Sequence, residues 1–529
     1  MAPLHYVGAA GTGRVPVDRK TVLSRDVVFV VYALVFAISA RFAFQQGSNI
    51  FPIAWVFFVM CAPLFFLSER FLIVTVVAFI VFFEQSLWFI SEGAPETVYE
   101  RDILGGKAVE FLVIAMAARF VVYEQNLSLI NRGIMVLMFL WFLAIVQGLL
   151  VSQINNVPLY NALIFSEIRS PALFLVFLVL MYNYVRREVR FFLKMFLILM
   201  LAKVAFTAVS VYLGVDILWT THASGYVGKQ AAFFGADESV KVVLLAAAVA
   251  MFWFLQSSQI PQFLTPNARR DVTDRPWFLG LCAFVFMLVI VVALRRGGIM
   301  GLGFVVLAGI PFAGVRSRVL LISVLMISLA FVLFAFFGET GLLPGFVQSA
   351  LERLLGQDQN VAQSDWGRKM DIIQGWEVIR AHPVLGNGAG TKLALARVAT
   401  YGKTESLVIH QNLAHMWVKF GILGVTTFIL TFVIPLLMFW RNRTLIRTTC
   451  PPWLASGAFA GASFLVAEFV WTLATPPFSM NFRSCAIVSF AIILIFAEIN
   501  DVRRVGARRA PDPEHGKRPV KRRHRASAH

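Results

Sequence analysis

Charged residues and cysteines are both scarce in this sequence of 529 residues. Asp, Glu, Lys and Arg together make up 14% of it, against about 25% in an average soluble domain. This scarcity excludes an ordinary cytosolic enzyme and a disordered chain. The four cysteines, Cys61, Cys282, Cys450 and Cys485, form no CxxC pair or other metal-ligand spacing. A zinc site and a disulfide framework are therefore both disfavoured, and we expect free thiols.

Long apolar runs dominate the sequence, in which 59% of residues are hydrophobic and 51 are Phe. A membrane-spanning helix needs about 20 apolar residues. We therefore predict an all-α, polytopic membrane protein with about 14 transmembrane helices, or 12 to 14. Run length places them at 27–43, 50–67, 71–90, 105–123, 133–152, 163–184, 191–213, 239–256, 278–294, 298–313, 318–337, 413–438, 453–475 and 482–499.

The net charge of +18 would suit a nucleic-acid partner, but the positions of the basic residues indicate membrane topology instead. With the N-terminus inside, the cytoplasmic connections and tails hold most of them, as the positive-inside rule requires. We therefore predict cytoplasmic termini, an even number of spans and no nucleic-acid partner. The basic residues of these inner segments include Arg14, Arg19, Lys20, Arg25, Arg186, Arg187, Arg269, Arg270, Arg316, Arg318, Arg441, Arg443 and Arg447.

This topology divides the chain into five segments. We predict a cytoplasmic segment 1–26, a transmembrane bundle of spans 1–11 over 27–337, a large periplasmic loop 338–412, spans 12–14 over 413–500, and a basic, disordered cytoplasmic tail 501–529. The first apolar run follows a polar stretch without a small-residue cleavage site, so we expect a retained span rather than a signal peptide.

Several ionisable residues fall in the outer halves of predicted spans. A charge at mid-bilayer costs roughly 3 kcal/mol on insertion scales, so such residues usually face a polar cavity or a partner. Together they favour a water-accessible pocket that opens outward, and the alternative is that each one snorkels or pairs structurally. Lys203 lies deeper and has no explanation at this level. The set is Glu84, Lys107, Glu110, Glu167, Arg169, Arg295, Arg296 and Glu468.

The large loop contains a predicted helix over 366–381, with Asp365 as its N-cap. Ile372, Ile373, Trp376 and Ile379 give this helix one apolar stripe. The stretch HPVLGNGAG follows, in which Gly386, Gly388 and Gly390 alternate. Alternate glycines bring backbone N–H groups close to a ligand in phosphate-binding loops, although a purely structural turn is the alternative.

Chemistry at the outer face depends on arginine and histidine. No DxD, HExxH or GxSxG occurs there, which disfavours a metal enzyme and a serine hydrolase. Arg295, Arg296 and Arg368 suit phosphate recognition, and His410 suits proton abstraction from a hydroxyl. This combination predicts that an alcohol attacks a carbon bearing a diphosphate leaving group, without metal or cofactor.

Four short motifs resemble those of the bacterial O-antigen ligase and polymerase superfamily. HQNLAHMWVKFGILG, residues 410–424, fits its pattern of His, then Asn, Ser or Gln, nine residues, Gly, two residues and Gly. HPVLGNGAG resembles the element that precedes it, and Arg368 with Trp376 resembles the opening of the loop helix. LRRGG, residues 294–298, resembles an SRGG element, with Arg295 in place of the usual Ser. The resemblance covers about residues 290–425.

The resemblance implies a GT-C-like membrane glycosyltransferase in the bacterial inner membrane. His410 would be the general base, and Arg296 and Arg368, with Arg295, would hold the diphosphate. His382, Gln411, His415, Gly386 and Gly388 would support the site. The partners would be membrane lipid, a glycan donor on undecaprenyl diphosphate, and an acceptor hydroxyl on a glycan or on lipid A-core.

Three functions fit this reading. The His410–Gln411 pair leans towards a ligase, which transfers finished polysaccharide. A polymerase of O-antigen, capsule or exopolysaccharide shares the motifs. A transporter or flippase for lipid-linked sugars belongs to a different class and would place charges along a transmembrane path.

Overall fold

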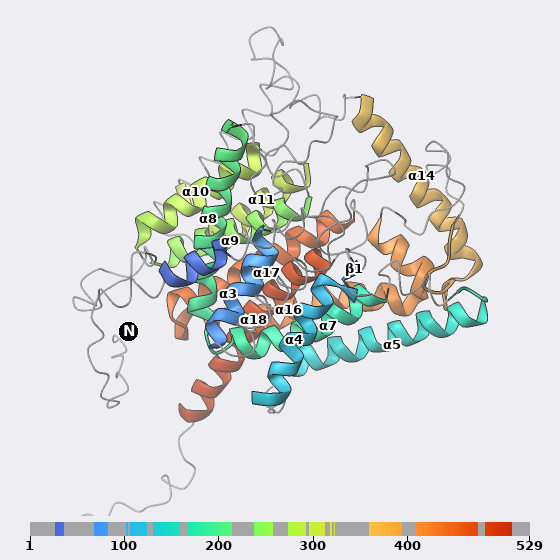
Figure 1. The fold of residues 1–529 in the computed structure, drawn as a ribbon, viewed down its shortest axis with the longest axis horizontal. Coiled ribbons are helices and arrows are strands. Elements are labelled where there is room, and N and C mark those ends of the chain that lie inside the picture. Colours follow the sequence, from blue (N-terminus) through green and yellow to red (C-terminus); the bar gives the residue numbers. More distant parts are fainter. Residues whose placement is uncertain are drawn as a thin grey trace, which may run out of the picture.

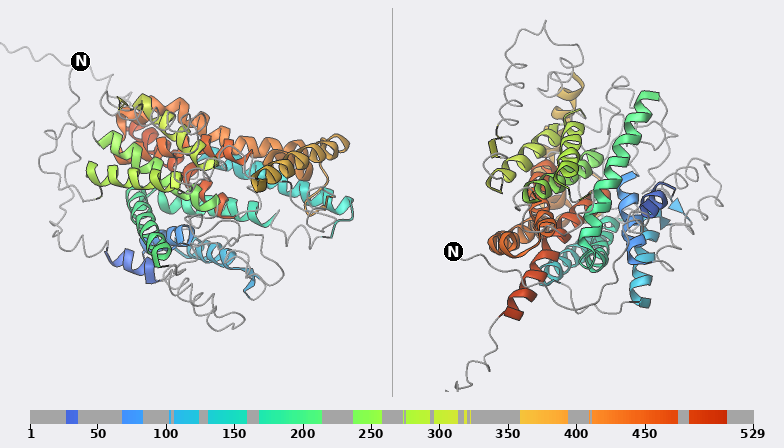
Figure 2. Two further views of the ribbon diagram at one scale, coloured as in Figure 1. Left: turned by 90° about the horizontal axis from the view of Figure 1, so that it is seen from above. Right: turned by 90° about the vertical axis from the view of Figure 1, so that its left-hand side faces the viewer.

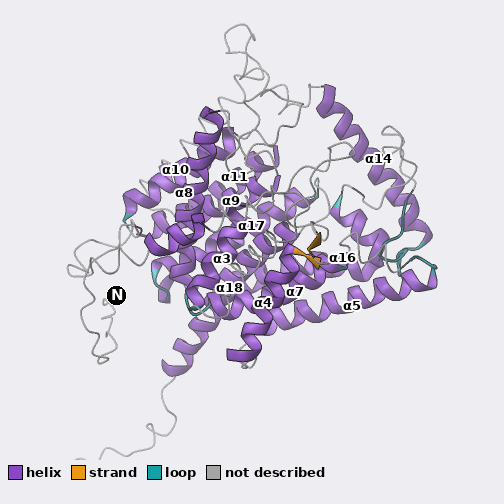
Figure 3. Cartoon of the chain, viewed as in Figure 1, coloured by secondary structure: helices purple, strands orange, loops and turns teal. Residues whose placement is uncertain are grey.

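The computed structural model of this chain is almost entirely helical in the part that it describes (Figures 1 and 3). Two-residue strands β1 (Asp102–Ile103) and β2 (Gly106–Lys107) form a small antiparallel hairpin. The described residues are 27–35, 68–82, 102–103, 106–123, 131–158, 168–213, 237–257, 273, 275–292, 296–312, 318–319, 322, 359–393, 409, 411–473 and 482–509. The labelled helices are α3 (Glu69–Phe82), α4 (Ala108–Tyr123), α5 (Arg132–Ile154), α7 (Arg169–Val185), α8 (Val189–Leu213), α9 (Asp237–Ser257), α10 (Pro276–Val292), α11 (Arg296–Gly309), α14 (Gln359–Ala381), α16 (Asn412–Thr449), α17 (Pro452–Thr472) and α18 (Phe482–Arg509).

The helices have the length and apolar surface of membrane spans. Within the described part of the chain, five are long and apolar enough to cross a bilayer, among them α5, α16 and α17. Helix α5 exposes Phe139, Phe142, Leu150 and Ile154. Such a surface is costly in water and favourable against acyl chains. The fold is therefore that of a polytopic membrane protein, as predicted, while the count of fourteen spans remains a prediction.

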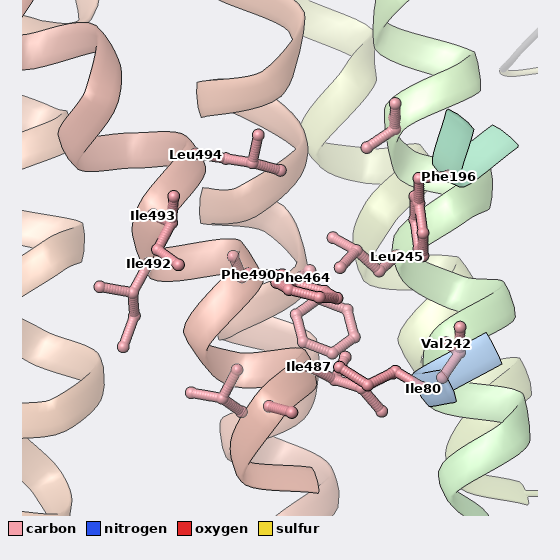
Figure 4. Packing of buried hydrophobic residues seen from close by; sticks show 14 of the residues in the cluster. Ile80, Phe196, Val242, Leu245, Phe464, Ile487, Phe490, Ile492, Ile493 and Leu494 are labelled. Carbon is pink, nitrogen blue, oxygen red and sulfur yellow. The ribbon is translucent and has the colours of Figure 1, made fainter. Parts of the chain in front are cut away.

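The core of the bundle lies around α17 and α18, which pack on α9 and α7. Phe464, Ile487 and Phe490 meet Leu245 and Phe196 there (Figure 4). Helix α17 is rich in Ala and Gly, and small residues let membrane helices approach closely. At Gly461 a Cβ atom would lie 2.5 Å from the carbonyl oxygen of Ala491, so only glycine permits this helix–helix distance.

Three buried cations tie the core together. Lys203 donates to the carbonyl of Val81 at 2.8 Å, and Arg483 donates to the carbonyls of Ile80 and Val81 at 2.9 and 3.3 Å. These are carbonyls of the last described turn of α3, and buried cations need such hydrogen-bond acceptors. Lys203, which the sequence left unexplained, therefore donates to the backbone of α3. The third cation, Lys241, belongs to the site described below.

One set of helix ends meets through paired charges. Arg70 at the start of α3 contacts Glu188 at 3.1 Å, and Arg187 contacts Glu69 at 2.9 Å. Both pairs join segments that the charge pattern assigns to the cytoplasmic side. At the opposite end of the bundle, contacts described below join six helix ends that are predicted to lie outside. These ends belong to α5, α9, α11, α16, α17 and α18.

The boundaries of three elements differ from the prediction. The span predicted from 105 is preceded by the β1–β2 hairpin, so its helix begins at Ala108. Helix α14 begins at Gln359, which makes Asp365 an interior residue rather than an N-cap, because 359–365 contains no helix breaker. Helix α18 runs to Arg509, into the tail predicted to be disordered, and ends shortly before Pro511. Residues 50–67 and most of 318–337 lie outside the described residues.

Candidate active site

Helix α14 is anchored on the first turns of α16. Ile379 of α14 packs in a small apolar cluster with Ile409, Ala414 and Val418. At Gly375, one turn earlier, a Cβ atom would lie 3.3 Å from Ile409. Of the predicted apolar stripe, Ile379 makes this contact, whereas Ile372, Ile373 and Trp376 are exposed. The segment before His410 is therefore held directly by α14.

The glycine turn, residues 382–390, is bound to a break in α16. Gly421 has φ +59° and ψ −156°, which interrupts the helix and frees the carbonyls before it. The N–H of Asn387 donates to the carbonyl of Val418 at 2.7 Å, and the N–H of Gly388 donates to that of Lys419 at 3.0 Å. In return, Ile422 donates to the carbonyl of Val384 at 3.1 Å. The two motifs that were separate in sequence thus form one junction.

Two glycines make this junction possible. Gly386 has φ +72°, and a Cβ atom there would lie 2.5 Å from the backbone nitrogen of Gly421. A Cβ atom on Gly421 would lie 2.0 Å from the carbonyl oxygen of Val384. Both obstacles are backbone, so no side-chain rotation can relieve them. The glycines at these positions allow two backbones to touch.

The N–H groups of the turn are used within the protein. Those of Gly386 and Ala389 donate to the carbonyls of His382 and Gly148 at 3.1 and 3.2 Å, and those of Asn387 and Gly388 donate to α16. The structural alternative for the glycines therefore holds, and these four N–H groups do not form a phosphate cradle.

The outer end of α5 fastens the turn from a third side. Gln147 donates to the carbonyls of Leu385 and Phe420 at 3.2 and 3.0 Å. Ser152 lies 2.6 Å from the carbonyl of Ala389, and Asn155 donates to that of Asn387 at 3.0 Å. Sequence reasoning missed these three polar residues, because nothing local relates them to a turn more than two hundred residues away.

Residues just after His410 are held in place at the start of α16. Gln411 is the N-cap, with its side chain accepting from the N–H of Ala414. Asn412 is buried and donates to the carbonyl of Thr472, at the end of α17, at 2.8 Å. His415 is buried one turn on, and its N–H donates to the carbonyl of Gln411 at 2.9 Å. The N-cap and the hydrogen bond from Asn412 to α17 thus fix the backbone beside the predicted base.

The end of α17 also supports the arginine turn that opens α11. A Cβ atom on Gly297 would lie 2.4 Å from the ring of Trp471, and one on Gly298 would lie 2.7 Å from Val240 of α9. Trp471 and Thr472 are consecutive, so a single turn of α17 touches both Gly297 and Asn412. The backbones of Arg296 and of the His410 segment are thereby brought to the same end of the bundle.

A buried ion pair lies beneath this turn. Lys241 contacts Glu468 at 2.6 Å, with 4% and 0% of the two side chains exposed. The ammonium also lies 3.5 Å from the hydroxyl of Ser484 and 5.5 Å from the centroid of the Trp471 ring. For Glu468 the structural pairing predicted as an alternative is the one found. Lys241 was missed because it stands at the edge of an apolar run, where a lysine ordinarily snorkels.

The remaining predicted site residues lie partly within and partly outside the described part of the chain. Arg296 opens α11 and Arg368 lies within α14, but their side chains are not among the described parts. Arg295, next to Arg296, lies outside the described residues. So does His410, which stands between the described residues Ile409 and Gln411. His382 is exposed and directly follows the last residue of α14, where its N–H donates to the carbonyl of Val378 at 3.3 Å.

Comparison with known proteins agrees with the motifs. Residues 281–429 match the protein family described as O-antigen ligase. This stretch contains α11, α14, the glycine turn and the first half of α16. The superfamily predicted from the sequence is thereby confirmed. No curated protein matches the chain.

Proposed function

Because residues 281–429 belong to the O-antigen ligase superfamily, we propose that this protein transfers a glycan from a polyprenyl diphosphate carrier to an acceptor hydroxyl. The carrier is undecaprenyl diphosphate, and the reaction takes place at the periplasmic face of a bacterial inner membrane. The acceptor is lipid A-core in a ligase or a further glycan in a polymerase. The bundle then has a GT-C-like architecture with both termini in the cytoplasm.

One observation carries this proposal: all four motifs belong to elements that pack on one another at one end of the bundle. The glycine turn binds the break in α16, and Gly375 of α14 adjoins Ile409. Trp471 and Thr472 link the arginine turn to the start of α16. Packing of these elements on one another would hold a base and phosphate-binding groups in a fixed geometry, which is how an enzyme positions reacting groups.

The proposed reaction is a single displacement. The imidazole of His410 takes the proton of the acceptor hydroxyl, and the oxygen attacks C1 of the donor sugar. The bond from C1 to the diphosphate oxygen breaks, and the leaving group departs with the electron pair. Arg296, Arg368 and Arg295 stabilise the charge that develops there. Gln411 and His415 hold the backbone that carries the base.

The direct test is in vitro transfer with purified protein, a lipid diphosphate-linked glycan and acceptor. We expect His410→Ala to lose transfer while folding normally, because the general base typically contributes about 10²–10⁴-fold in rate. Arg368→Lys should also lose most activity, since an ammonium cannot replace the planar, bidentate guanidinium. Glu377→Gln, on the exposed side of the same helix, is the matched control. Transfer by His410→Ala at the wild-type rate would remove this residue as the base.

The same preparation tests the absence of a metal requirement. We expect transfer to continue in EDTA at an undiminished rate. Loss of transfer in EDTA with recovery on adding a divalent cation would contradict the proposed chemistry.

A deletion strain separates the possible functions by the glycan that accumulates. Long chains on the carrier together with bare core are expected for a ligase, and single lipid-linked repeats for a polymerase. Repeats trapped on the cytoplasmic face would indicate a flippase and would contradict the proposal.

A further inference from the structure

One face of α14 is exposed although it is largely apolar. Ile373 and Trp376 are 54% and 45% exposed, and Trp366 and Ile372 are similar. Lys369 and Arg380 are exposed as well. At 3.6 residues per turn these side chains occupy about one third of the helix circumference. We call the set Trp366, Lys369, Ile372, Ile373, Trp376 and Arg380 the outer face of α14.

The opposite face is already occupied. Gly367, Asp371, Gly375 and Ile379 are buried, and the last two meet the start of α16. The outer face is therefore most of the surface that remains exposed after α14 has docked, with Glu377 and Ala381 at its edge. In Figure 1 and in the left view of Figure 2, α14 lies at the outer end of α5 and α16.

This face continues a surface that faces lipid. Leu150 and Ile154, at the outer end of α5, are exposed. The glycine turn is hydrogen-bonded to that end of α5, and it exposes Val384 and Leu385. The exposed apolar side chains of the span, the turn and the adjoining helix thus lie in neighbouring elements, with the polar side chains of Gln147 and Asn155 binding the turn to α5.

The composition fits a membrane interface better than a glycan or a second copy. Ile372, Ile373 and Val384 offer apolar area but no hydrogen bond to sugar hydroxyls. The Trp376 ring already contacts Trp417 edge-on, with centroids 5.8 Å apart. In a second copy placed face to face, the exposed acid of the described helix that could pair with Lys369 and Arg380 is Glu377, which gives one carboxylate for two cations. Trp and Ile interleaved with Lys and Arg are typical of helices that lie in the head-group region.

We propose that the outer face of α14 lies in the head-group region of the outer leaflet. Its Trp and Ile side chains enter the acyl boundary, and Lys369 and Arg380 contact lipid phosphates. This placement would set the depth of the glycine turn and the start of α16 relative to the phosphates of the leaflet. The proposal rests on the chain being a membrane protein and does not depend on glycosyl transfer.

Spin labels on the full-length protein in lipid nanodiscs test this placement. A nitroxide on Ile373→Cys should collide several-fold more often with oxygen, which concentrates in acyl chains, than with a water-soluble nickel chelate. The matched label on Ala381→Cys, exposed at the end of the same helix, should show the reverse. Val384→Cys is the second position if Ile373→Cys fails to fold, and it should behave as Ile373→Cys does.

Two outcomes would overturn the proposal. Preferential collision with nickel at both Ile373 and Val384 would mean that water or a glycan covers the face. Weak collision with both reagents would mean that protein covers it.

A second experiment tests whether Lys369 and Arg380 contact lipid phosphates. Replacing phosphatidylcholine with equal parts of phosphatidylcholine and phosphatidylglycerol should raise the oxygen preference at position 373. The variant that combines Lys369→Gln with Arg380→Gln should not respond. An equal response in that variant would refute the contact of these two residues with lipid phosphates.

Discussion

Gly421→Ala tests the junction between the glycine turn and α16. The alanine would have to adopt φ +59° and ψ −156°, a region that costs of the order of 1–3 kcal/mol for a residue with a side chain. Its Cβ atom would lie 2.0 Å from the carbonyl oxygen of Val384, so the turn must move away. Two or three backbone hydrogen bonds are then lost, each worth about 1 kcal/mol. The junction is thus weakened by about 4 kcal/mol, roughly a thousandfold in the equilibrium between its closed and open forms.

Amide hydrogen exchange of the protein in nanodiscs measures this effect. The N–H groups of Asn387 and Gly388, which donate to α16, should exchange far faster in Gly421→Ala than in the wild type. Glycan transfer should fall in the same preparation. Gly303→Ala is the control, because a Cβ atom at that position would meet no other atom within 4 Å and its helix favours alanine by about 1 kcal/mol. Unchanged protection at Asn387 in Gly421→Ala would refute the reasoning.

Three further variants probe other contacts. Glu468→Ala should lower the thermal stability strongly, since an unpaired buried Lys241 costs about 3–5 kcal/mol. Replacing both Glu468 and Lys241 by Leu should recover most of that loss. An equal loss of stability in the single and the double variant would contradict the pairing. Ser152→Ala should cost about 1 kcal/mol and speed proteolysis of the glycine turn, whereas unchanged proteolysis would argue against its role there. Arg70→Ala should change the unfolding temperature little, because its pair with Glu188 is half exposed and worth under about 1 kcal/mol; a large drop would contradict that assessment.

The spans and the motifs could be predicted from sequence because both depend on local information. Run length alone locates helices such as α5 and α17, since a bilayer demands continuous apolar surface. Their ends were less predictable. Helix α14 begins before Trp366 because its preceding polar residues tolerate helix, and α18 continues through charged residues until a proline approaches.

The arrangement of the site depends on long-range contacts that no local pattern records. Gly386 looks like an ordinary turn glycine and Gly421 like a glycine within a predicted span, and only their close approach explains why neither can carry a side chain. Lys241 and Arg483 stand at the edges of apolar runs, where cations usually reach for head groups. In the folded protein one pairs with Glu468 and the other donates to backbone carbonyls of α3.

The most direct test of the account is the side of the membrane on which the glycine turn lies. Lys392→Cys, just after the turn, and Thr444→Cys, near the far end of α16, are both exposed and can be made in a background lacking Cys61 and Cys450. In intact spheroplasts a membrane-impermeant maleimide should label position 392 at once and position 444 only after permeabilisation. Labelling in the opposite order would place the proposed catalytic segment in the cytoplasm and contradict the account.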